Sequence, residues 1–281
     1  MKTDTLDCKI HKTALHESHQ TLNAKMVPFG GFKMPVSYAD GIQSEYFAVR
    51  NDVGIFDVSH MGEFIITGNN ALEFLQKVTI NDVSKLNVGQ AQYSAMCYPD
   101  GGIVDDLILY RKSDSYFMVV NAANIQKDFD WISQHIPNDT HVEDISSNIS
   151  LVALQGPRSR ELLSKFTDDK LKMPFYSFKE ASICGFSTML SRTGYTGELG
   201  FEIYASEEAI INIWDEMVNA GYDSWSPSDN IRVDGSMFNT GGTDFTPILG
   251  GALPYLTSTA VDTRSDWQKW KDSFKEDWKA K

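Results

Sequence analysis

The chain of 281 residues is long enough for two domains, and its 42% of hydrophobic residues can build a sizeable core. The formal net charge is −13 and no stretch rich in Lys and Arg interrupts it, which argues against binding to nucleic-acid backbones or to anionic lipid surfaces. No uninterrupted apolar run approaches the roughly 20 residues that a membrane-spanning helix needs.

The first residues are polar and contain an acid early, which is unlike a secretory signal or an Arg-rich transit peptide. The three cysteines, Cys8, Cys97 and Cys184, are too widely spaced for a zinc set or a disulfide framework. We therefore expect a cytoplasmic protein. His16 and His19 lie one turn apart on a helix predicted over 12–20, but two histidines without further ligands predict no metal site.

The predicted elements mix helices and strands. Residues 25–36 contain two prolines and two glycines, which indicates an extended, turning path and a plausible cavity wall. Helices are predicted over 41–51, 70–79, 125–135, 158–166 and 207–220. Strands are predicted over 54–59, 63–67, 91–98, 103–110, 116–121, 150–156, 180–184, 186–192 and 201–204. Hairpins without regular strand–helix–strand alternation indicate the α+β class.

Two adjacent acids, Asp105 and Asp106, lie inside the predicted strand that follows the Gly101-Gly102 turn. Side chains alternate along a strand, so the two carboxyl groups must point to opposite faces and one of them must point inward. A buried carboxylate is costly unless it is paired or hydrogen-bonded. It is either a strand-end acid that caps the backbone or a group aimed at a ligand.

A second dense motif runs over 193–202 and contains three glycines, Tyr195 and Glu202. Glycines let a backbone approach a ligand closely, Tyr195 offers a ring and a hydroxyl, and a carboxylate in the following strand is again unusual. The alternative is an ordinary tight loop before a strand. The sequence contains no Walker motif or dinucleotide fingerprint, so phosphate binding is not indicated.

Six short stretches occur in the order in which the aminomethyltransferase family, the T-protein of the glycine cleavage system, carries them. They are Met26–Phe32, Phe56–Met61, Gly101–Leu107, Val119–Ala122, Ala153–Pro157 and Gly194–Glu198. Over about residues 12–222 the chain therefore resembles this folate-binding family. The resemblance implies two interleaved ferredoxin-like α+β domains, with tetrahydrofolate bound in a central channel between them.

The resemblance also implies a reaction. A T-protein is a transferase of one-carbon metabolism and glycine catabolism, and it uses tetrahydrofolate as the acceptor substrate. It moves the methylene carbon of an aminomethyl group from the lipoyl arm of the H-protein to tetrahydrofolate. Ammonia is released and dihydrolipoyl remains. We therefore expect tetrahydrofolate and the lipoylated H-protein as partners, and neither nucleic acid nor membrane.

The family's motifs assign the site residues. Asp106 corresponds to the family's functional acid near the folate nitrogens, and Asp105 is expected to be structural. A fixed carboxylate can orient the pterin, stabilise developing positive charge or accept a proton, and the sequence does not decide among these roles. The positions that match folate-contacting residues are Met61, Tyr93, Val119, Asn121, Tyr195 and Glu202. Without the family match, Met61 and Val119 would be interpreted as core residues.

The match ends at about Tyr222, and Arg232 is not a convincing counterpart of the arginine that holds the folate tail in the family. We expect residues 223–281 to be an atypical tail, rich in loops, in place of the family's C-terminal β-barrel domain. Its terminal amphipathic helix carries an apolar stripe of Trp267, Trp270, Phe274 and Trp278. A natural replacement, a shifted reading frame and a fusion all remain open as its origin.

Two other functions also remain open. One is a truncated, non-catalytic folate-binding protein, which would bind folate without turnover. The other is a related folate-dependent demethylase, against which the lack of a flavin or dinucleotide fingerprint argues. Because the tail departs from the family, the predicted activity rests on residues 12–222.

Overall fold

The computed structural model describes residues 10–223 and 232–233. Cys8 and the predicted helix with the tryptophan stripe lie outside the described residues. The helices are α1 (His16–Thr21), α2 (Ile42–Asn51), α3 (Ala71–Val78), α4 (Ile125–Ser133), α5 (Ser159–Leu163) and α6 (Glu207–Asp223). Short 3-10 helices are η1 (Val83–Lys85), η2 (Ala122–Asn124) and η3 (Ser146–Asn148).

The strands form three sheets. A hairpin joins β1 (Lys25–Phe29) and β2 (Phe32–Ser37). The five-stranded sheet has the order β5-β6-β7-β4-β8, with β4 (Gly62–Thr67), β5 (Ala91–Cys97), β6 (Ile103–Arg111), β7 (Ser115–Val120) and β8 (His141–Asp144). The six-stranded sheet has the order β10-β11-β12-β9-β3-β13, with β3 (Gly54–Asp57), β9 (Ser150–Gln155), β10 (Phe178–Ile183), β11 (Phe186–Ser191), β12 (Gly200–Ala205) and β13 (Arg232–Val233).

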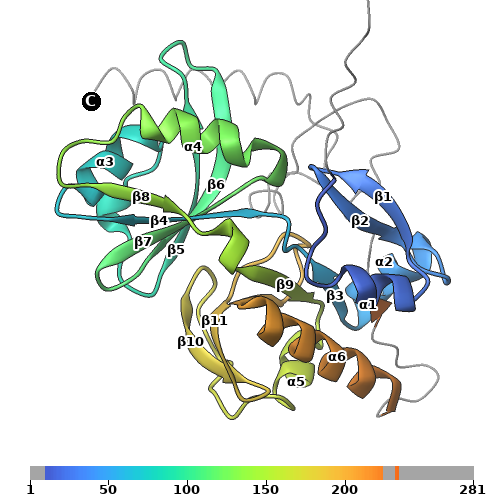
Figure 1. Cartoon of the computed structure of the whole chain (residues 1–281). Coiled ribbons are helices and arrows are strands. Elements are labelled where there is room, and N and C mark those ends of the chain that lie inside the picture. The colour runs from blue at the N-terminus through green and yellow to red at the C-terminus, as the bar shows by residue number, and fades with distance from the viewer. Residues whose placement is uncertain (1–9, 224–231, 234–281) are drawn as a thin grey trace, which may run out of the picture.

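The two large sheets are interleaved along the chain (Figure 1). In chain order, β3 of the six-stranded sheet comes first, and all strands of the five-stranded sheet follow it. The chain then returns to the six-stranded sheet with β9, which pairs with β3. Both units combine helices with mostly antiparallel strands and hairpins, without repeated βαβ crossovers. The mixed α+β class with interleaved units, expected from the sequence, is confirmed.

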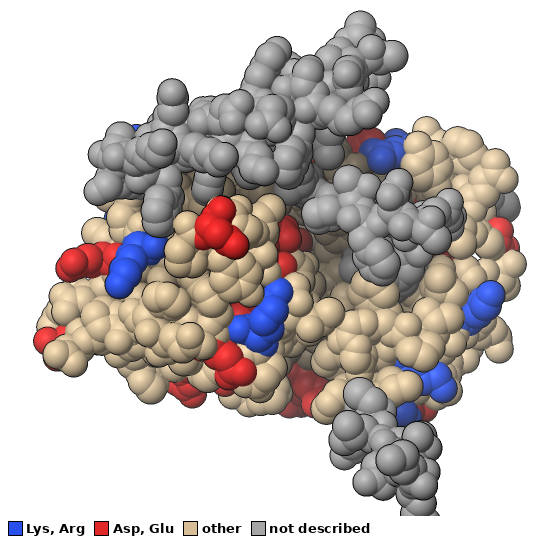
Figure 2. Space-filling view, turned by 90° about the horizontal axis from the view of Figure 1, so that it is seen from above, with Lys and Arg blue, Asp and Glu red and all other residues tan. Residues whose placement is uncertain are grey.

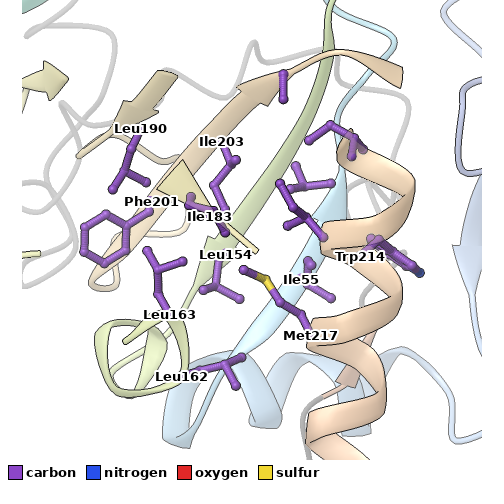
Figure 3. Packing of buried hydrophobic residues seen from close by; sticks show 14 of the residues in the cluster. Ile55, Leu154, Leu162, Leu163, Ile183, Leu190, Phe201, Ile203, Trp214 and Met217 are labelled. Carbon is purple, nitrogen blue, oxygen red and sulfur yellow. The ribbon is translucent and has the colours of Figure 1, made fainter. Parts of the chain in front are cut away.

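Three apolar clusters set the order of the layers. Residues of α3 and α4 pack on one face of the five-stranded sheet. Residues of α5 and α6 pack on the outer face of the six-stranded sheet, where Met217 points from α6 toward Ile55 and Leu154 (Figure 3). A third cluster, which we call the middle layer, joins Tyr110 and Phe117 of the five-stranded sheet to strands of the other sheet. The inner faces of the two sheets therefore face each other.

Strand β9 shows why its sequence folds this way. All six of its residues are buried. Val152 and Leu154 belong to the cluster under α6, whereas Leu151 and Ala153 belong to the middle layer. A strand covered on both faces reads as a continuous apolar run rather than as an alternation, and Leu151 to Leu154 is such a run.

The stretch over 25–36 forms the β1-β2 hairpin. A Cβ added at Gly30 would lie 3.1 Å from the Cβ of Ala122, so the tip of the hairpin lies against the start of η2. The rings of Phe29 and Phe32 contact His60 edge-on at centroid distances of 5.6 and 6.3 Å. The extended, turning path that the prolines and glycines predicted thus packs beside the loop that follows β7.

Several boundaries differ from the sequence prediction. The helix predicted over 158–166 is only five residues long, and α1 begins at His16 rather than near residue 12. Strand β8 was not predicted, because an edge strand with three exposed residues out of four carries little apolar signal. The chain returns to the six-stranded sheet at β13, which pairs in parallel with Gly54 and Ile55.

No helix in the described part of the chain is long and apolar enough to cross a membrane. Figure 2 shows Lys and Arg scattered over one face rather than gathered into a patch. The same view shows a hollow between the part built on the five-stranded sheet and the part that contains β1, β2 and α2.

Candidate functional site

Predicted site residues share one face of the five-stranded sheet. Tyr93 on β5 pairs with Ile108 on β6, Ile108 pairs with Val119 on β7, and Val119 pairs with Glu63 on β4. Directly paired residues point to the same side, so these four side chains form one row across the sheet. Asp106 precedes Ile108 by two residues on β6 and therefore points to this side too.

Asp106 is held by two side chains. The Tyr93 hydroxyl donates to Oδ2 of Asp106 at 2.9 Å, and the amide Nδ2 of Asn121 donates to Oδ1 at 2.9 Å. Burial, followed by the charge of Asp106, raises the pKa of Tyr93 well above its usual value near 10. The phenol therefore stays protonated and remains a donor. The carboxylate is half-buried, so its orientation is fixed while part of its surface stays accessible.

Asp105 points to the opposite face, as the alternation along the strand predicted. It is buried, and its strand neighbours on that face, Leu107 and Leu109, belong to the core under α3 and α4. Asn121 follows the last residue of β7, and its amide also donates to Oδ1 of Asp105 at 3.1 Å. A single amide group at the strand end thus joins the two acids across the edge of the sheet.

Glu202 lies on β12 of the facing sheet and is buried among hydroxyl groups. The hydroxyls of Tyr110 and Tyr204 lie 3.5 and 3.4 Å from its Oε2, and the Thr193 hydroxyl contacts the same oxygen. Burial raises the pKa of Glu202, although these hydrogen bonds act in the opposite direction. Tyr110 and Tyr204 also bond each other at 2.9 Å, which ties β6 to β12.

Glu202 and Asp106 therefore approach the middle layer from opposite sheets. Tyr110, which bonds Glu202, lies four residues beyond Asp106 on β6. A separation of four residues along a strand corresponds to roughly 13 Å. The structure thus places two carboxyl groups at two ends of a stretch lined by tyrosine and apolar side chains.

The remaining predicted residues border this layer. Tyr195 is partly buried, and its ring meets Phe56 edge-on at a centroid distance of 5.5 Å. Met61 is partly buried against the same cluster, and Val119 is buried within it. The structure brings Asp106, Tyr93 and Asn121 into direct contact, whereas Tyr195, Met61 and Glu202 make no hydrogen bond to that trio in the described residues.

Two glycines of the 193–202 motif make room for a buried side chain. A Cβ at Gly194 would lie 2.1 Å from Oε1 of Gln155, and one at Gly200 would lie 2.3 Å from its Nε2. The Gln155 amide is buried there and donates to the carbonyls of Thr193 and Phe201 at 3.4 Å. These two glycines therefore make room for a protein side chain, and the close approach of the loop backbone to a ligand stays a prediction.

Sequence reasoning did not single out Glu63. The residue is fully buried in the row with Tyr93 and Val119, and neither of its carboxyl oxygens has a hydrogen-bond partner among the described residues. Burial, assisted by the charge of Asp144, raises the pKa of Glu63 well above its usual value. The available signal was an acid inside the predicted strand 63–67, the same signal that drew attention to Asp106.

A second constellation was also missed. Nε2 of His19 contacts Oδ2 of Asp57 at 2.9 Å, and the Tyr38 hydroxyl contacts Nδ1 of the same ring at 2.8 Å. The Thr13 hydroxyl donates to Asp57 at 2.7 Å. The ring nitrogens of His19 therefore contact protein groups that join α1 to β2 and β3. In the part of the chain that the structure describes, no group of three or more metal-ligating side chains is assembled.

A surface pocket of about 840 Å³ lies away from these residues, between the end of α5, the β10-β11 turn and α6. None of the predicted site residues lines it, and Lys165, Asp169, Cys184 and Glu216 are among those that do. Burial raises the pKa of the Cys184 thiol to about 11, which makes it a poor nucleophile. The chemistry described above therefore centres on the middle layer, not on this pocket.

Comparison with known proteins identifies related chains. Residues 15–225 match the family model of the GCVT N-terminal domain. The chain is 52% identical over 212 residues to an aminomethyltransferase of Chloroherpeton thalassium, covering 74% of this chain and 58% of that protein. It is 43% identical over 265 residues to an aminomethyltransferase of Geobacillus sp., covering 90% of this chain and 72% of that protein.

A solved structure of an aminomethyltransferase is also similar to this chain. The glycine cleavage system aminomethyltransferase T of Bartonella henselae superposes with a TM-score of 0.70 at 31% identity, covering 74% of this chain and 57% of that one. The chain thus spans about three fifths of the length of the first of these relatives. An alignment that covers 90% of this chain also reaches beyond residue 222, where the resemblance was expected to end.

Proposed function

Because this chain belongs to the family of the GCVT N-terminal domain, we propose that it is a tetrahydrofolate-dependent aminomethyltransferase of glycine cleavage. Its membership agrees with the six stretches from which the resemblance was predicted. The proposed reaction moves a methylene carbon from an aminomethyl-lipoyl thioether to two nitrogens of tetrahydrofolate. The amine leaves as ammonia and the sulfur leaves as a thiol.

The observation that supports this proposal most directly is the fixed carboxylate of Asp106. The Tyr93 hydroxyl and the Asn121 amide hold its two oxygens at 2.9 Å each, on the face that looks toward the opposite sheet. A preorganised carboxylate stabilises positive charge that develops when ammonia departs, without reorganisation during the step. Orientation of the attacking nitrogen and acceptance of its proton through an intermediary are further roles that the same group can serve.

Folate recognition forms the second part of the proposal. A pterin edge presents N–H donors and a carbonyl, which carboxylates and amides recognise. We assign this recognition to Glu202 and Asn121, with Met61, Val119 and Tyr195 as apolar and aromatic walls. Glu202 presents Oε2 to the hydroxyls of Thr193, Tyr110 and Tyr204, so its other oxygen, Oε1, is the one we assign to the ligand.

The partners and the chain organisation belong to the same proposal. The lipoylated H-protein supplies the aminomethyl group, and the reaction takes place in the cytoplasm. Residues 12–222 make up the proposed folate-binding region, and beyond them the structure describes Asp223 at the end of α6 and the return of β13 to the sheet.

Calorimetry of the full chain with tetrahydrofolate tests the proposal. We expect micromolar binding that weakens about tenfold in Asp106→Asn, because a hydrogen-bonding charge is lost near the ligand. In an assay with aminomethylated H-protein, methylene transfer by the variant should fall at least about 100-fold. Its thermal unfolding should resemble that of the wild type.

Asp114→Asn is the matched control, since Asp114 is exposed in the turn between β6 and β7. It should bind and turn over like the wild type. Lack of tetrahydrofolate binding by a folded sample contradicts the proposal. Binding without transfer instead identifies a non-catalytic folate-binding protein.

A further inference from the structure

Behind the proposed site lies a pair of buried acids. Asp105 on β6 and Asp128 on α4 are 7% and 0% exposed. Nζ of Lys127 on α4 donates to the Val104 carbonyl on β6 at 2.6 Å, which brings Asp128 next to Asp105, so that the two carboxyl groups are hydrogen-bonding neighbours. Buried carboxylates are rare unless they are paired with opposite charge, and this pair brings two acids together.

The hydrogen-bonding of the pair requires a proton. Oδ2 of Asp105 and both carboxyl oxygens of Asp128 accept no hydrogen bond from any N–H group or hydroxyl among the described residues. An ionised carboxylate can only accept, so two of them cannot bond to each other. One proton placed between them supplies a donor and also removes the like-charge repulsion.

The surroundings decide which acid carries the proton. Oδ1 of Asp105 accepts the Asn121 amide at 3.1 Å, which favours the charged form of Asp105. The cation beside Asp128 is Lys127, whose Nζ lies 3.8 Å from Oδ1 of Asp128. That ammonium already donates a hydrogen bond to the Val104 carbonyl at 2.6 Å. The proton therefore belongs on Asp128.

We propose that Asp128 is a positioning residue that keeps a proton at neutral pH and donates it to Asp105, so that Asp105 and Asp106 together hold the Asn121 amide. The amide nitrogen then faces the two acids, and its oxygen faces away from them. The shared proton is inferred from the burial and contacts of the two acids, whereas its effect on folate binding rests on the proposed function.

The two acids near Asp128 favour this assignment, and their effect together with burial outweighs that of the nearby lysine. Burial, then the hydrogen bond and the charge of Asp105, and more weakly the charge of Asp106, raise the pKa of Asp128 to about 9. Lys127 acts in the opposite direction. Ionisation of Asp128 in alkaline solution would place a second negative charge beside Asp105. The hydrogen bond that holds the Asn121 amide on Asp105 would then be disturbed.

Carbon NMR of the full chain, labelled at aspartate carboxyl groups, tests the shared proton without any ligand. We expect one carboxyl carbon that keeps the protonated chemical shift at neutral pH and titrates in the alkaline range. It should be missing in Asp128→Asn and present in Asp130→Asn, a control on the exposed side of the same helix. The proposal is overturned if all aspartates titrate in acid, or if the alkaline titration persists in Asp128→Asn.

The side-chain NH2 resonances of Asn121, assigned by their loss in Asn121→Ser, test the positioning. They should shift in Asp128→Leu, which lacks a donor, and should stay in place in Asp130→Asn. In the wild type they should move with pH at the same midpoint as the carboxyl carbon, a measurement that needs no variant to fold. Resonances that follow neither the pH nor the variant overturn the positioning role.

Tetrahydrofolate binding then connects this pair to the ligand. Asp128→Asn keeps a donor and should bind within about twofold of the wild type, whereas Asp128→Leu should lose about tenfold, the equivalent of one hydrogen bond. Equal loss in both variants, or no loss in Asp128→Leu, contradicts the inference. Absence of binding by the wild type contradicts the proposed function and leaves the two NMR tests to decide the inference.

Discussion

The Tyr93 hydroxyl donates to the Asp106 carboxylate at 2.9 Å, although the two residues are not direct partners in the sheet. Ala95 pairs with Asp106 and Ile108 pairs with Tyr93, so the hydrogen bond runs diagonally across β5 and β6. Diagonal neighbours in a sheet lie within reach of a long aromatic side chain. The contact holds one carboxylate oxygen, while Asn121 holds the other.

Replacement of Tyr93 by Phe should reveal the value of this contact. The ring and its packing remain, and only the donor to Asp106 is lost. We expect folate affinity and methylene transfer to fall about fivefold to tenfold, with a stability loss of about 1 kcal/mol. Calorimetry, the transfer assay and urea unfolding measure the three quantities. Tyr98→Phe, at a more exposed tyrosine beyond β5, should change none of them. Indistinguishable behaviour of the two variants contradicts a role for the Tyr93 hydroxyl.

Two pairs of contacting side chains, one buried and one exposed, should show how much burial adds to the contribution of a contact to stability. His19 and Asp57 form a pair with fully buried side chains, whereas Lys12 and Glu17 form one with side chains that are 59% and 78% exposed. Asp57→Ala leaves His19 and Thr13 without their buried partner and should cost about 3–5 kcal/mol. Glu17→Ala should cost less than about 1 kcal/mol. Urea unfolding measures both. Similar losses in the two variants contradict the structural role of the buried pair.

His60 should contribute to the loss of stability in acid. Burial lowers its pKa to about 4, an effect that the charge of Asp57 opposes, whereas an unfolded histidine titrates near 6.5. Between these values the unfolded chain binds a proton that the native chain does not. The unfolding free energy therefore falls as the pH falls through this window, by about 3 kcal/mol at most.

Urea unfolding between about pH 7 and pH 4 measures this dependence. In His60→Gln the unfolding free energy should depend less steeply on pH, because glutamine does not titrate. His141→Gln at an exposed position of β8 should keep the slope of the wild type. A slope unchanged by His60→Gln means that other groups account for the acid sensitivity.

Gly194 should tolerate no side chain while Gln155 is present. The Cβ of Gly194→Ala would overlap Oε1 of Gln155 at 2.1 Å, in a buried site with little room to relax. We expect a loss of about 1–3 kcal/mol. In Gln155→Ala the same substitution should cost much less, since its obstacle is gone. Unfolding curves of the four chains give the coupling energy, and strict additivity would rule out this clash as the cause.

Local patterns in the sequence were sufficient for much of this molecule. The period of two along β6 predicted that Asp105 and Asp106 point to opposite faces, because that alternation is a property of the strand alone. The apolar run of β9 and the amphipathic pattern of α6 likewise follow from residues close in sequence. The hairpins without regular strand–helix–strand alternation predicted the α+β class, the family resemblance added its interleaved units, and the structure confirms both.

The tertiary structure decided everything that depends on distant partners. Asn121 bonds both Asp105 and Asp106 because β7 ends beside β6. Asp57 contacts His19 because α1 packs against β3. Gly194 must be a glycine because Gln155, 39 residues earlier, occupies the space beside it. Strand periodicity and turn chemistry act over a few residues, whereas a hydrogen bond between buried groups depends on which elements the fold places side by side. The sequence by itself therefore determined which faces carry the acids, and only the fold determined what holds them.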